Sequence, residues 1–503
     1  MIKGWTGKRL HIDLSLRKVW TEDIAPGDLR HWLGGRGLNA SLFSQRFRSP
    51  VAPDSPENPI AFAVGPLTGT LAPCSGWTSI ASISPLLDLP RYSTTRMPGH
   101  FGASLKGAGF DQCVLQGKAN RPVYLCIDSG EVRFEEAGQL WGKNTVETAV
   151  TIQEEEGDRS LEVLCIGPAG ERQLPFANVI HRLSWTGDRL GLGYLFGVKQ
   201  LKAIAIRGKK PITLHDPRWF LNLCLELKDR ILKDQRIKRL KENGTFSLLD
   251  REEGKMARKA NGRLPFGSEE QWAASLRTYL CGQEGCSSCP VHCGLNIEHQ
   301  EGYFGGIHLE KAWCLGPQIG VYNGEWTLKL HRLCQTQGLD PFLTGSFLTR
   351  ILEGVENGPL SEEDLRHMDG IGDQGEKAFA ILHRILKSQK KEFQPVATPV
   401  SQNEDLDVLA DIISFCLIVV NRLNLMTVSN MIDLVHSVTG YALSKEGLRD
   451  TISNILRMES RLQNKEPDLT EGSSLPRLGE GQINEILKRE ERNNESIAHR
   501  TSS

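Results

Sequence analysis

Three cysteines lie close together in the stretch Cys286-Ser-Ser-Cys289-Pro-Val-His-Cys293, at gaps of two and three residues. Thiols this close bind a metal or a cluster more readily than they form disulfides in a reducing compartment. A closed site needs a fourth ligand, and the best candidate is Cys416, in the apolar run that begins at Asp411. A cysteine in such a run is usually a small buried hydrophobe. The three thiols that lack a partner favour a ligand role for Cys416 instead.

The spacing favours an iron–sulfur cluster over zinc. Structural zinc usually takes Cys pairs, or Cys with His, in a small polar module, whereas this triplet lies mid-chain and Cys416 is on a distant apolar element. Four thiolates in tight groups are typical of [4Fe–4S] clusters. Two alternatives stay open: Cys281 is a spare thiol next to the triplet that replaces one ligand, or His292 binds zinc. We interpret His292 as a residue beside the site or on the surface.

Length, charge and cysteine usage limit the class of protein. A chain of 503 residues is long enough for two or three domains. The formal net charge of −1 gives no indication of a nucleic-acid or membrane-surface partner. No apolar run has the length of a membrane-spanning helix, and the first residues show no signal-peptide core. With twelve cysteines, mostly in apolar surroundings, the chain suits a reduced compartment, and we expect it to be cytoplasmic.

Residues 1–208 are predicted to form a β-rich domain. Apolar and polar residues alternate over Arg9–Leu14 and return over Lys18–Thr21 after a turn, which indicates a hairpin. The glycine-rich stretch 187–193 leads into a strand after a short turn, which is the wrong order for a dinucleotide-binding unit, so we reject that interpretation. Further strands are predicted at 58–64, 78–84, 122–127, 161–166 and 202–207, and a helix at 39–47.

The pattern becomes helical in the rest of the chain. Trp219–Leu240 and Trp326–Gln337 carry apolar residues at three- and four-residue steps. We therefore expect an α+β protein whose β-rich first domain is followed by two mainly helical domains. The predicted boundaries are 215–395 for the domain with the cysteine triplet and 396–503 for the domain with Cys416, with a polar loop at 244–267, a connector at 394–405, helices over 406–464 and a frayed tail from 493.

Several motifs, in this order, resemble the aldehyde:ferredoxin oxidoreductase family of tungsten-pterin enzymes. The resemblance covers most of the chain, and the order of the matches is far more specific than any one motif. The motifs are Leu33-Gly-Gly-Arg-Gly-Leu, Gly65-Pro-Leu-Thr-Gly-Thr, Phe101-Gly-Ala-Ser-Leu-Lys-Gly-Ala-Gly-Phe-Asp, Ile166-Gly-Pro-Ala-Gly-Glu, the cysteine triplet, Glu310-Lys-Ala-Trp, Gly338-Leu-Asp, Asp411-x4-Cys416 and Val438-Thr-Gly-Tyr.

The resemblance implies a β-rich first domain under a bis-pterin that carries tungsten or molybdenum, with two helical domains above it. It implies that Cys286, Cys289, Cys293 and Cys416 hold a [4Fe–4S] cluster that passes electrons to ferredoxin or another iron–sulfur carrier. The substrate would be a small aldehyde or carboxylate, and the chain would be an oligomer or a subunit of a redox complex in an anaerobic cytoplasm.

The resemblance also implies roles for individual polar residues. It maps Asp340 and Asp411 onto carboxylates that accept N–H bonds from the pterin, although each residue is also suited to a helix N-terminus. Arg189 matches a family arginine at the cofactor. Glu310 matches a carboxylate near the metal and is the candidate general acid or base.

This chain departs from the family where the cofactor phosphates bind. Trp77 replaces an arginine, and Arg96-Met-Pro-Gly99 replaces a glycine turn. Arg96 and Gly99 are candidates for a remodelled contact with the cofactor. The long glycine-rich stretch that carries a proton-transfer histidine is replaced between Leu386 and Asp405 by the short connector; His308 is a substitute for that histidine or a surface residue.

Three hypotheses follow. The chain is an oxidoreductase that interconverts aldehydes and carboxylates, as the retained Arg189, Glu310, Asp340 and Asp411 favour. Alternatively it is a pterin-free [4Fe–4S] electron-transfer or scaffold subunit of a larger redox complex, which the missing glycine-rich stretch favours. The third hypothesis is a zinc-stabilised structural protein.

Overall fold

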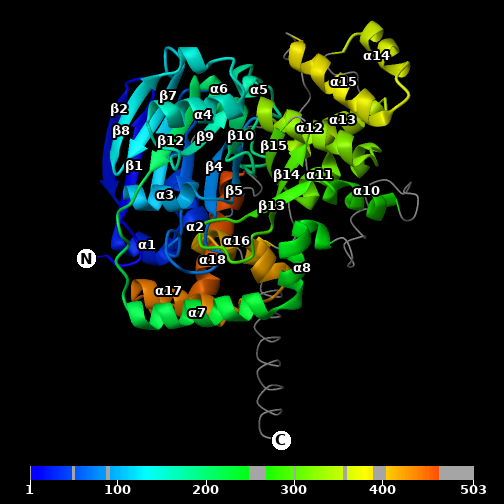
Figure 1. Ribbon diagram of the computed structural model, residues 1–503. Coiled ribbons are helices and arrows are strands. Elements are labelled where there is room, and N and C mark those ends of the chain that lie inside the picture. The colour runs from blue at the N-terminus through cyan, green and yellow to red at the C-terminus, as the bar shows by residue number, and fades with distance from the viewer. Residues whose placement is uncertain are drawn as a thin grey trace, which may run out of the picture.

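The computed structural model describes residues 2–47, 51–86, 91–248, 268–299, 302–354, 360–388 and 404–463. Two mixed sheets formed within residues 8–207 stand together, and the helices that follow lie below and beside them (Figure 1). This arrangement confirms the predicted α+β class. Over the described ranges, no helix has the length and apolar character needed to cross a membrane.

The first sheet has the strand order β2-β1-β6-β3-β4-β5, in which only β1 and β6 run parallel. The predicted hairpin is confirmed as β1 and β2, and helix α2 packs against β3 and β4 through apolar side chains such as Phe43. The elements are β1 (Lys8–Asp13), β2 (Lys18–Asp23), α1 (Pro26–Trp32), α2 (Gly35–Arg46), β3 (Ile60–Ala63), β4 (Thr78–Ser84), β5 (Arg91–Met97), α3 (Phe101–Ala108) and β6 (Gln112–Gln116).

The second sheet has the order β11-β10-β9-β12-β7-β8, with β7 and β12 parallel. One apolar core contains residues of both sheets, among them Leu10, Phe62, Leu125 and Ile204, so the sheets stabilise each other by sharing buried surface. The elements are β7 (Val123–Asp128), β8 (Glu131–Glu136), α4 (Thr145–Glu155), β9 (Glu162–Ile166), α5 (Pro168–Glu171), β10 (Val179–His181), β11 (Trp185–Thr186), α6 (Leu192–Val198) and β12 (Leu201–Arg207).

The middle of the chain is helical with two corrections. A three-stranded antiparallel sheet, β13-β14-β15, is present, and the cysteine triplet lies between β13 and β14; its short, glycine-containing strands give a weak sequence signal. The helix predicted over Trp219–Leu240 is two helices, because Asp234 caps the second by accepting from Arg236 N. The elements are α7 (Pro217–Lys233), α8 (Gln235–Asn243), α10 (Ser268–Arg277), β13 (Leu280–Glu284), β14 (Gly294–His299), β15 (Gly302–Ile307), α11 (Leu309–Cys314), α12 (Gly324–Gln337), α13 (Pro341–Leu352), α14 (Glu362–Asp369) and α15 (Gln374–Lys387).

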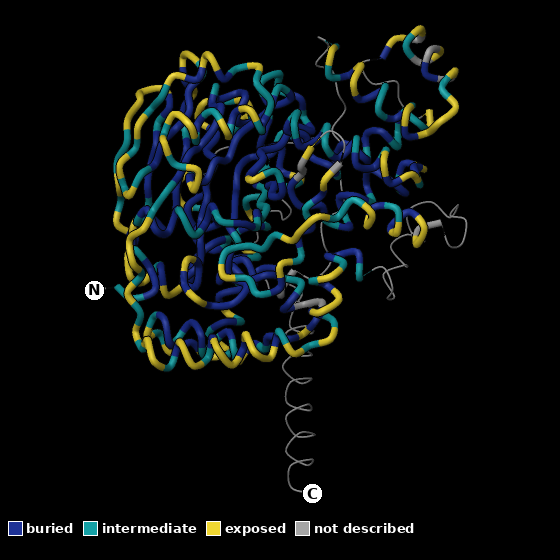
Figure 2. The backbone as a smooth tube through the Cα atoms, viewed as in Figure 1, coloured by how far each residue is buried: buried dark blue, intermediate teal, exposed yellow. Residues whose placement is uncertain are grey.

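The last helices are α16 (Glu404–Ile413), a π-helical turn at Ile418–Arg422, α17 (Val428–Thr439) and α18 (Lys445–Leu462). They return to the first part of the chain: α16 and α18 pack against α2, and α17 lies beside α7, whose outer face is exposed (Figures 1 and 2). The Arg36 guanidinium of α2 pairs with both Glu459 oxygens of α18, at 2.8 and 2.6 Å. Three predicted segments lie wholly or partly outside the described residues. They are the loop at 244–267 from residue 249 onward, most of the connector at 394–405, and the tail from 493.

A fully buried ion pair joins the first sheet to the turn that follows β3. Lys106 Nζ lies 2.5 Å from Asp111 Oδ1 and also donates to the carbonyl of Gly65 at 3.1 Å. The other Asp111 oxygen accepts from Gly7 N and Thr6 Oγ1 at 2.7 and 3.0 Å. Burial lowers the pKa of Lys106, and the nearby Asp111 charge opposes this shift. The pair therefore holds the Gly65 turn in place only while both charges are present.

Replacing Asp111 with Ala should destabilise the fold strongly, by about 3–5 kcal/mol, because Lys106 would remain buried without its counter-charge. The shift of the thermal unfolding midpoint measures the effect. The control is Glu136→Ala, which breaks the exposed pair between Arg17 and Glu136 and should cost about 0–1 kcal/mol. Equal shifts for the two variants would contradict a structural role for the buried pair.

Candidate functional site

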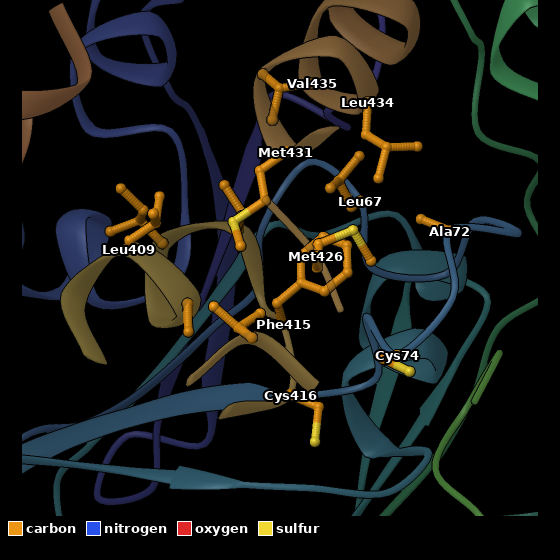
Figure 3. Packing of buried hydrophobic residues seen from close by; sticks show 14 of the residues in the cluster. Leu67, Ala72, Cys74, Leu409, Phe415, Cys416, Met426, Met431, Leu434 and Val435 are labelled. Carbon is orange, nitrogen blue, oxygen red and sulfur yellow. The ribbon is translucent and has the colours of Figure 1, made fainter. Parts of the chain in front are cut away.

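Five cysteines from three distant segments meet where the first sheet, the small sheet and α16 come together. The predicted ligands Cys286, Cys289 and Cys293 lie in and at the end of the loop between β13 and β14, and Cys416 follows α16. The fifth cysteine, Cys74, was not singled out from the sequence; its Sγ lies 3.8 Å from Cys289 Sγ. Figure 3 shows Cys74 and Cys416 side by side at the edge of an apolar cluster.

Backbone hydrogen bonds tie the three segments to one another. Cys74 N donates to Ser288 O at 3.2 Å, and Cys416 N donates to Cys74 O at 3.0 Å. Trp77 N donates to Ser414 O at 3.3 Å, which adds a second link between the Cys74 and Cys416 segments. The positions of the thiols are therefore set by the main chain and not by side-chain packing alone.

Left-handed backbone conformations turn the chain at each of these segments. The non-glycine residues with left-handed backbone in these segments are Cys74 (φ +66°), Ser288 (φ +56°), His292 (φ +51°) and Ser414 (φ +66°). Each is a site cysteine or lies within two residues of one. Such conformations cost of order 1–3 kcal/mol each and persist only where the surroundings enforce them. Their clustering here is typical of a site that binds something.

The thiols influence one another electrostatically. The hydrogen bond with Cys74 lowers the pKa of Cys289 to about 7, against the effect of burial, and the same bond raises the pKa of Cys74. Burial and the neighbouring Cys289 raise the pKa of Cys416 to about 11. Burial also raises the pKa of Cys286 and of Cys293, and the charge of Cys416 acts on both. The pKa values of Cys286, Cys293 and Cys416 thus depend on the charges of other predicted ligands, so the predicted ligands lie close together.

The two alternative ligands lie differently. Cys281 is exposed on β13, where burial and the charge of Glu298 raise its pKa. His292 is exposed, which fits its interpretation as a residue beside the site. Within the described ranges, no three His, Cys, Asp or Glu side chains are grouped closely enough to hold a single metal ion.

Arg96 and Asp411 meet in a second polar group next to Cys416. Arg96 pairs with Asp407 at 3.1 Å and with Asp411 at 3.4 Å, and its guanidinium lies 5.7 Å from the centre of the Trp77 ring. Arg36 lies 3.7 Å from the other Asp411 oxygen. Burial raises the pKa of Asp411, and the two arginines oppose this shift. The sequence predicted both residues as cofactor-binding; the structure adds that they contact each other.

Asp340 and Arg189 are also in contact. One Asp340 oxygen caps α13 by accepting from Phe342 N and Leu343 N, and the other accepts from Arg189 N at 2.6 Å. Burial, followed by the charge of Asp188, raises the pKa of Asp340 to about 7. The Arg189 guanidinium stacks on Phe342, 4.1 Å from the ring centre. Asp340 therefore caps a helix, which was the alternative to cofactor binding that the sequence offered for this residue.

Glu310 lies in the first turn of α11, and its charge acts on Cys293 and His308. The expectation that His308 is a surface residue is wrong: its Nε2 is buried and has no hydrogen-bond partner among the described residues. Burial, followed by the charge of Lys311, lowers the pKa of His308 to about 4. Lys311, which the sequence reasoning missed, is buried and pairs with Asp188 at 3.4 Å. The only sequence signal for Lys311 was its position directly after Glu310 in the family motif.

Several other buried polar atoms, beside Arg96 or beside His308, have no hydrogen-bond partner within the described part of the chain. They are Trp77 Nε1, Trp185 Nε1, Asp407 Oδ1 and both ring nitrogens of His331. Buried donors and acceptors are normally satisfied, because an unmade hydrogen bond costs about 1–3 kcal/mol. The set contains both donors and acceptors, which suits a polar, heterocyclic ligand.

Gly99 contacts both Trp185 and the cysteine loop. Its carbonyl accepts from Ser287 N at 3.0 Å. It has φ +119°, and a Cβ at this position would lie 2.7 Å from Trp185 Cδ1. Only glycine fits both the backbone conformation and the space.

Replacing Gly99 with Ala should displace the Ser287 segment and lower the iron content of the purified protein, with a strain of about 1–3 kcal/mol. Iron analysis and thermal unfolding measure the two effects. Gly138→Ala is the matched control, because a Cβ there meets nothing within 4 Å. Normal iron content in the Gly99 variant would show that the cysteine loop does not depend on this contact.

Comparison with known proteins identifies two matching domain families. "Aldehyde ferredoxin oxidoreductase, N-terminal domain" matches residues 9–208, and "Aldehyde ferredoxin oxidoreductase, domains 2 & 3" matches residues 222–396. The tungsten-containing aldehyde ferredoxin oxidoreductase of Pyrococcus furiosus is 33% identical over 379 residues, which cover 73% of this chain and 61% of that protein. The enzyme of the same name from Pyrococcus abyssi is 32% identical over 77% of this chain and 65% of that protein.

More distant similarities extend the comparison. The aliphatic sulfonate oxidoreductase, WOR-like subunit, of Pyrococcus furiosus is 28% identical over 77% of this chain and 65% of that protein. Among solved structures, the active-site complex BamBC of benzoyl coenzyme A reductase has the same fold, with a TM-score of 0.75, 19% identity and coverage of 92% of this chain and 90% of that chain. The chain spans less than two thirds of the length of these curated relatives. It belongs to the aldehyde ferredoxin oxidoreductase family.

Proposed function

We propose that this protein is an oxidoreductase that interconverts an aldehyde and its carboxylate at a tungsten (or molybdenum) bis-pterin, with electrons leaving through a [4Fe–4S] cluster. The observation that carries the proposal is the meeting of Cys286, Cys289, Cys293 and Cys416 in a chain that matches this family over both regions. Two of the relatives that it resembles are named as tungsten-containing aldehyde ferredoxin oxidoreductases. The pterin-free subunit is therefore the less favoured hypothesis.

The cysteine site suits a cluster on chemical grounds. Four thiolates supply the ligand set that [4Fe–4S] clusters take. The apolar residues around Cys416 would shield the cluster from water, and the amides that lock the loops would keep the thiols in position without the cluster. This chain's part in electron transfer is thus to hold and insulate the cluster.

The pterin would be held by the residues predicted from the sequence: Arg96, Gly99, Arg189, Asp340 and Asp411. Asp340 and Asp411 are buried acceptors, and two indole N–H groups without a partner among the described residues, those of Trp77 beside Arg96 and Trp185 beside Gly99, are donors. When bound, the metal–pterin group would supply the two-electron chemistry of aldehyde oxidation. The protein residues would bind and orient it.

Proton handling falls to Glu310 and its neighbours in this proposal. The family histidine has no counterpart in the sequence, and most of the connector that replaces its segment is not described. His308 and Lys311 are ionisable groups on the same segment as Glu310, and burial keeps His308 neutral at physiological pH. Glu310 would hold or move the proton at its carboxylate, with His308 Nε2 available as a hydrogen-bond partner for the substrate.

The physiological partner would be ferredoxin or another iron–sulfur carrier, and an oxygen-sensitive cluster would suit an anaerobic cytoplasm. One relative is named as a subunit of a larger enzyme and one similar structure is a complex.

Metal analysis of anaerobically purified protein tests the proposal, together with aldehyde-dependent reduction of a viologen dye. We expect about four irons per chain with tungsten or molybdenum, and dye reduction that needs the aldehyde. Iron without tungsten, molybdenum or dye reduction would favour the pterin-free subunit, and zinc alone would contradict both.

Replacing Cys289 with Ala should abolish the broad visible absorption of the cluster, because a thiolate ligand would be lost. Cys281→Ala is the matched control and should leave the absorption unchanged, since Cys281 is exposed on β13. Loss of absorption in the Cys281 variant would mean that the third ligand is assigned wrongly.

A further inference from the structure

Cys74 is a fifth thiol at a site that needs four. It belongs to the segment between the Gly65 turn and β4, and its side chain is buried, with 1% exposed. Its Sγ contacts Cys289 Sγ at 3.8 Å, a distance at which a thiol donates a hydrogen bond to another sulfur. Cys74 lies outside the motifs that carry the family resemblance, so its role needs its own explanation.

The backbone gives Cys74 no freedom to leave this contact. Its amide donates to Ser288 O and its carbonyl accepts from Cys416 N, so it is bonded to both segments that carry the predicted ligands. Its φ of +66° is a left-handed conformation that a non-glycine residue rarely keeps without such restraints. Ser288 Oγ further fixes the segment by donating to Thr70 O at 2.6 Å.

Charge decides which role the fifth thiol can take. Four thiolates complete the coordination of a [4Fe–4S] cluster. A fifth thiolate buried against Cys289 would place two like charges together in an apolar site, which is costly. A protonated thiol avoids this cost and gives the Cys289 sulfur a hydrogen bond.

We propose that Cys74 donates an S–H hydrogen bond to the Cys289 sulfur that ligates the cluster and thereby raises the reduction potential of the cluster. This inference rests on the proposed function, because it requires the [4Fe–4S] cluster. Reduction adds negative charge to the cluster and its sulfur ligands. A hydrogen bond to a ligand sulfur stabilises that charge, and such bonds are among the factors that set cluster potentials. Cys74 is thus a positioning and tuning residue, not a ligand.

The test is a redox titration of the anaerobically purified full-length protein, followed by electron paramagnetic resonance, for the wild type, Cys74→Ala and Cys74→Ser. We expect all three to contain the same iron, because no ligand is removed. The Ala variant should have a more negative midpoint potential, whereas the Ser variant keeps a donor and should stay closer to the wild type. Cys113→Ala is the matched control, since Cys113 is a buried cysteine in the core of the sheets, and its potential should not change.

Four outcomes would overturn the inference. Loss of iron in the Ala variant would show that Cys74 is a ligand, and an unchanged potential would show that its thiol does not affect the cluster. If the Ala variant does not fold, resonance Raman spectra of the wild type in H₂O and D₂O replace it: an isotope shift of an iron–cysteine stretch is expected, and its absence contradicts the hydrogen bond. A wild type without iron would refute the proposed cluster itself, which separates that failure from the other three.

Discussion

The candidate site depends on a small set of main-chain hydrogen bonds between loops that are hundreds of residues apart. Cys416 N donates to Cys74 O, and Cys74 N donates to Ser288 O, so the segments after α16 and before β4 and the cysteine loop form one unit. A thiolate site assembled from distant segments must be held against the repulsion of its own charges. Backbone bonds do this without competing for the thiols, because they use only amides and carbonyls.

The same unit is anchored to the first sheet through glycine contacts. A Cβ on Gly65 would lie 2.6 Å from the carbonyl carbon of Ile413, and a Cβ on Gly35 would lie 1.9 Å from the carbonyl oxygen of Asp411. Gly65 N also donates to Ser414 Oγ at 2.8 Å. Because Gly35 and Gly65 have no Cβ, the end of α16 can pack directly against them. Asp411 lies on this helix, and Cys416 follows it. The buried Lys106–Asp111 pair holds the Gly65 turn from the other side.

Residue patterns predicted those parts of the fold that follow from local periodicity, and the reasons for the misses are physical. Alternation predicted the β1–β2 hairpin and β4, and short apolar runs predicted β7, β9 and β12, because one or both faces of these strands are buried. The small sheet β13-β14-β15 was missed, since short strands with glycines lack that signal. The Cys286–Cys293 spacing indicated the candidate cluster site, but Cys74 has no spacing relation to the triplet, and only the fold brings it there. The surface alternative for His308 failed because one polar residue before a short helix carries no burial signal.

The charges around Asp411 constrain how a pterin would bind. Arg36 and Arg96 face Asp407, Asp411 and Glu459, so the carboxylates outnumber the guanidinium groups. A cofactor phosphate placed against Arg96 would also meet Asp407 and Asp411, whose negative charge would repel it. Asp407 Oδ1 has no hydrogen-bond partner in the described part of the chain and is open to a donor. This group therefore suits the N–H edge of a pterin better than its phosphate.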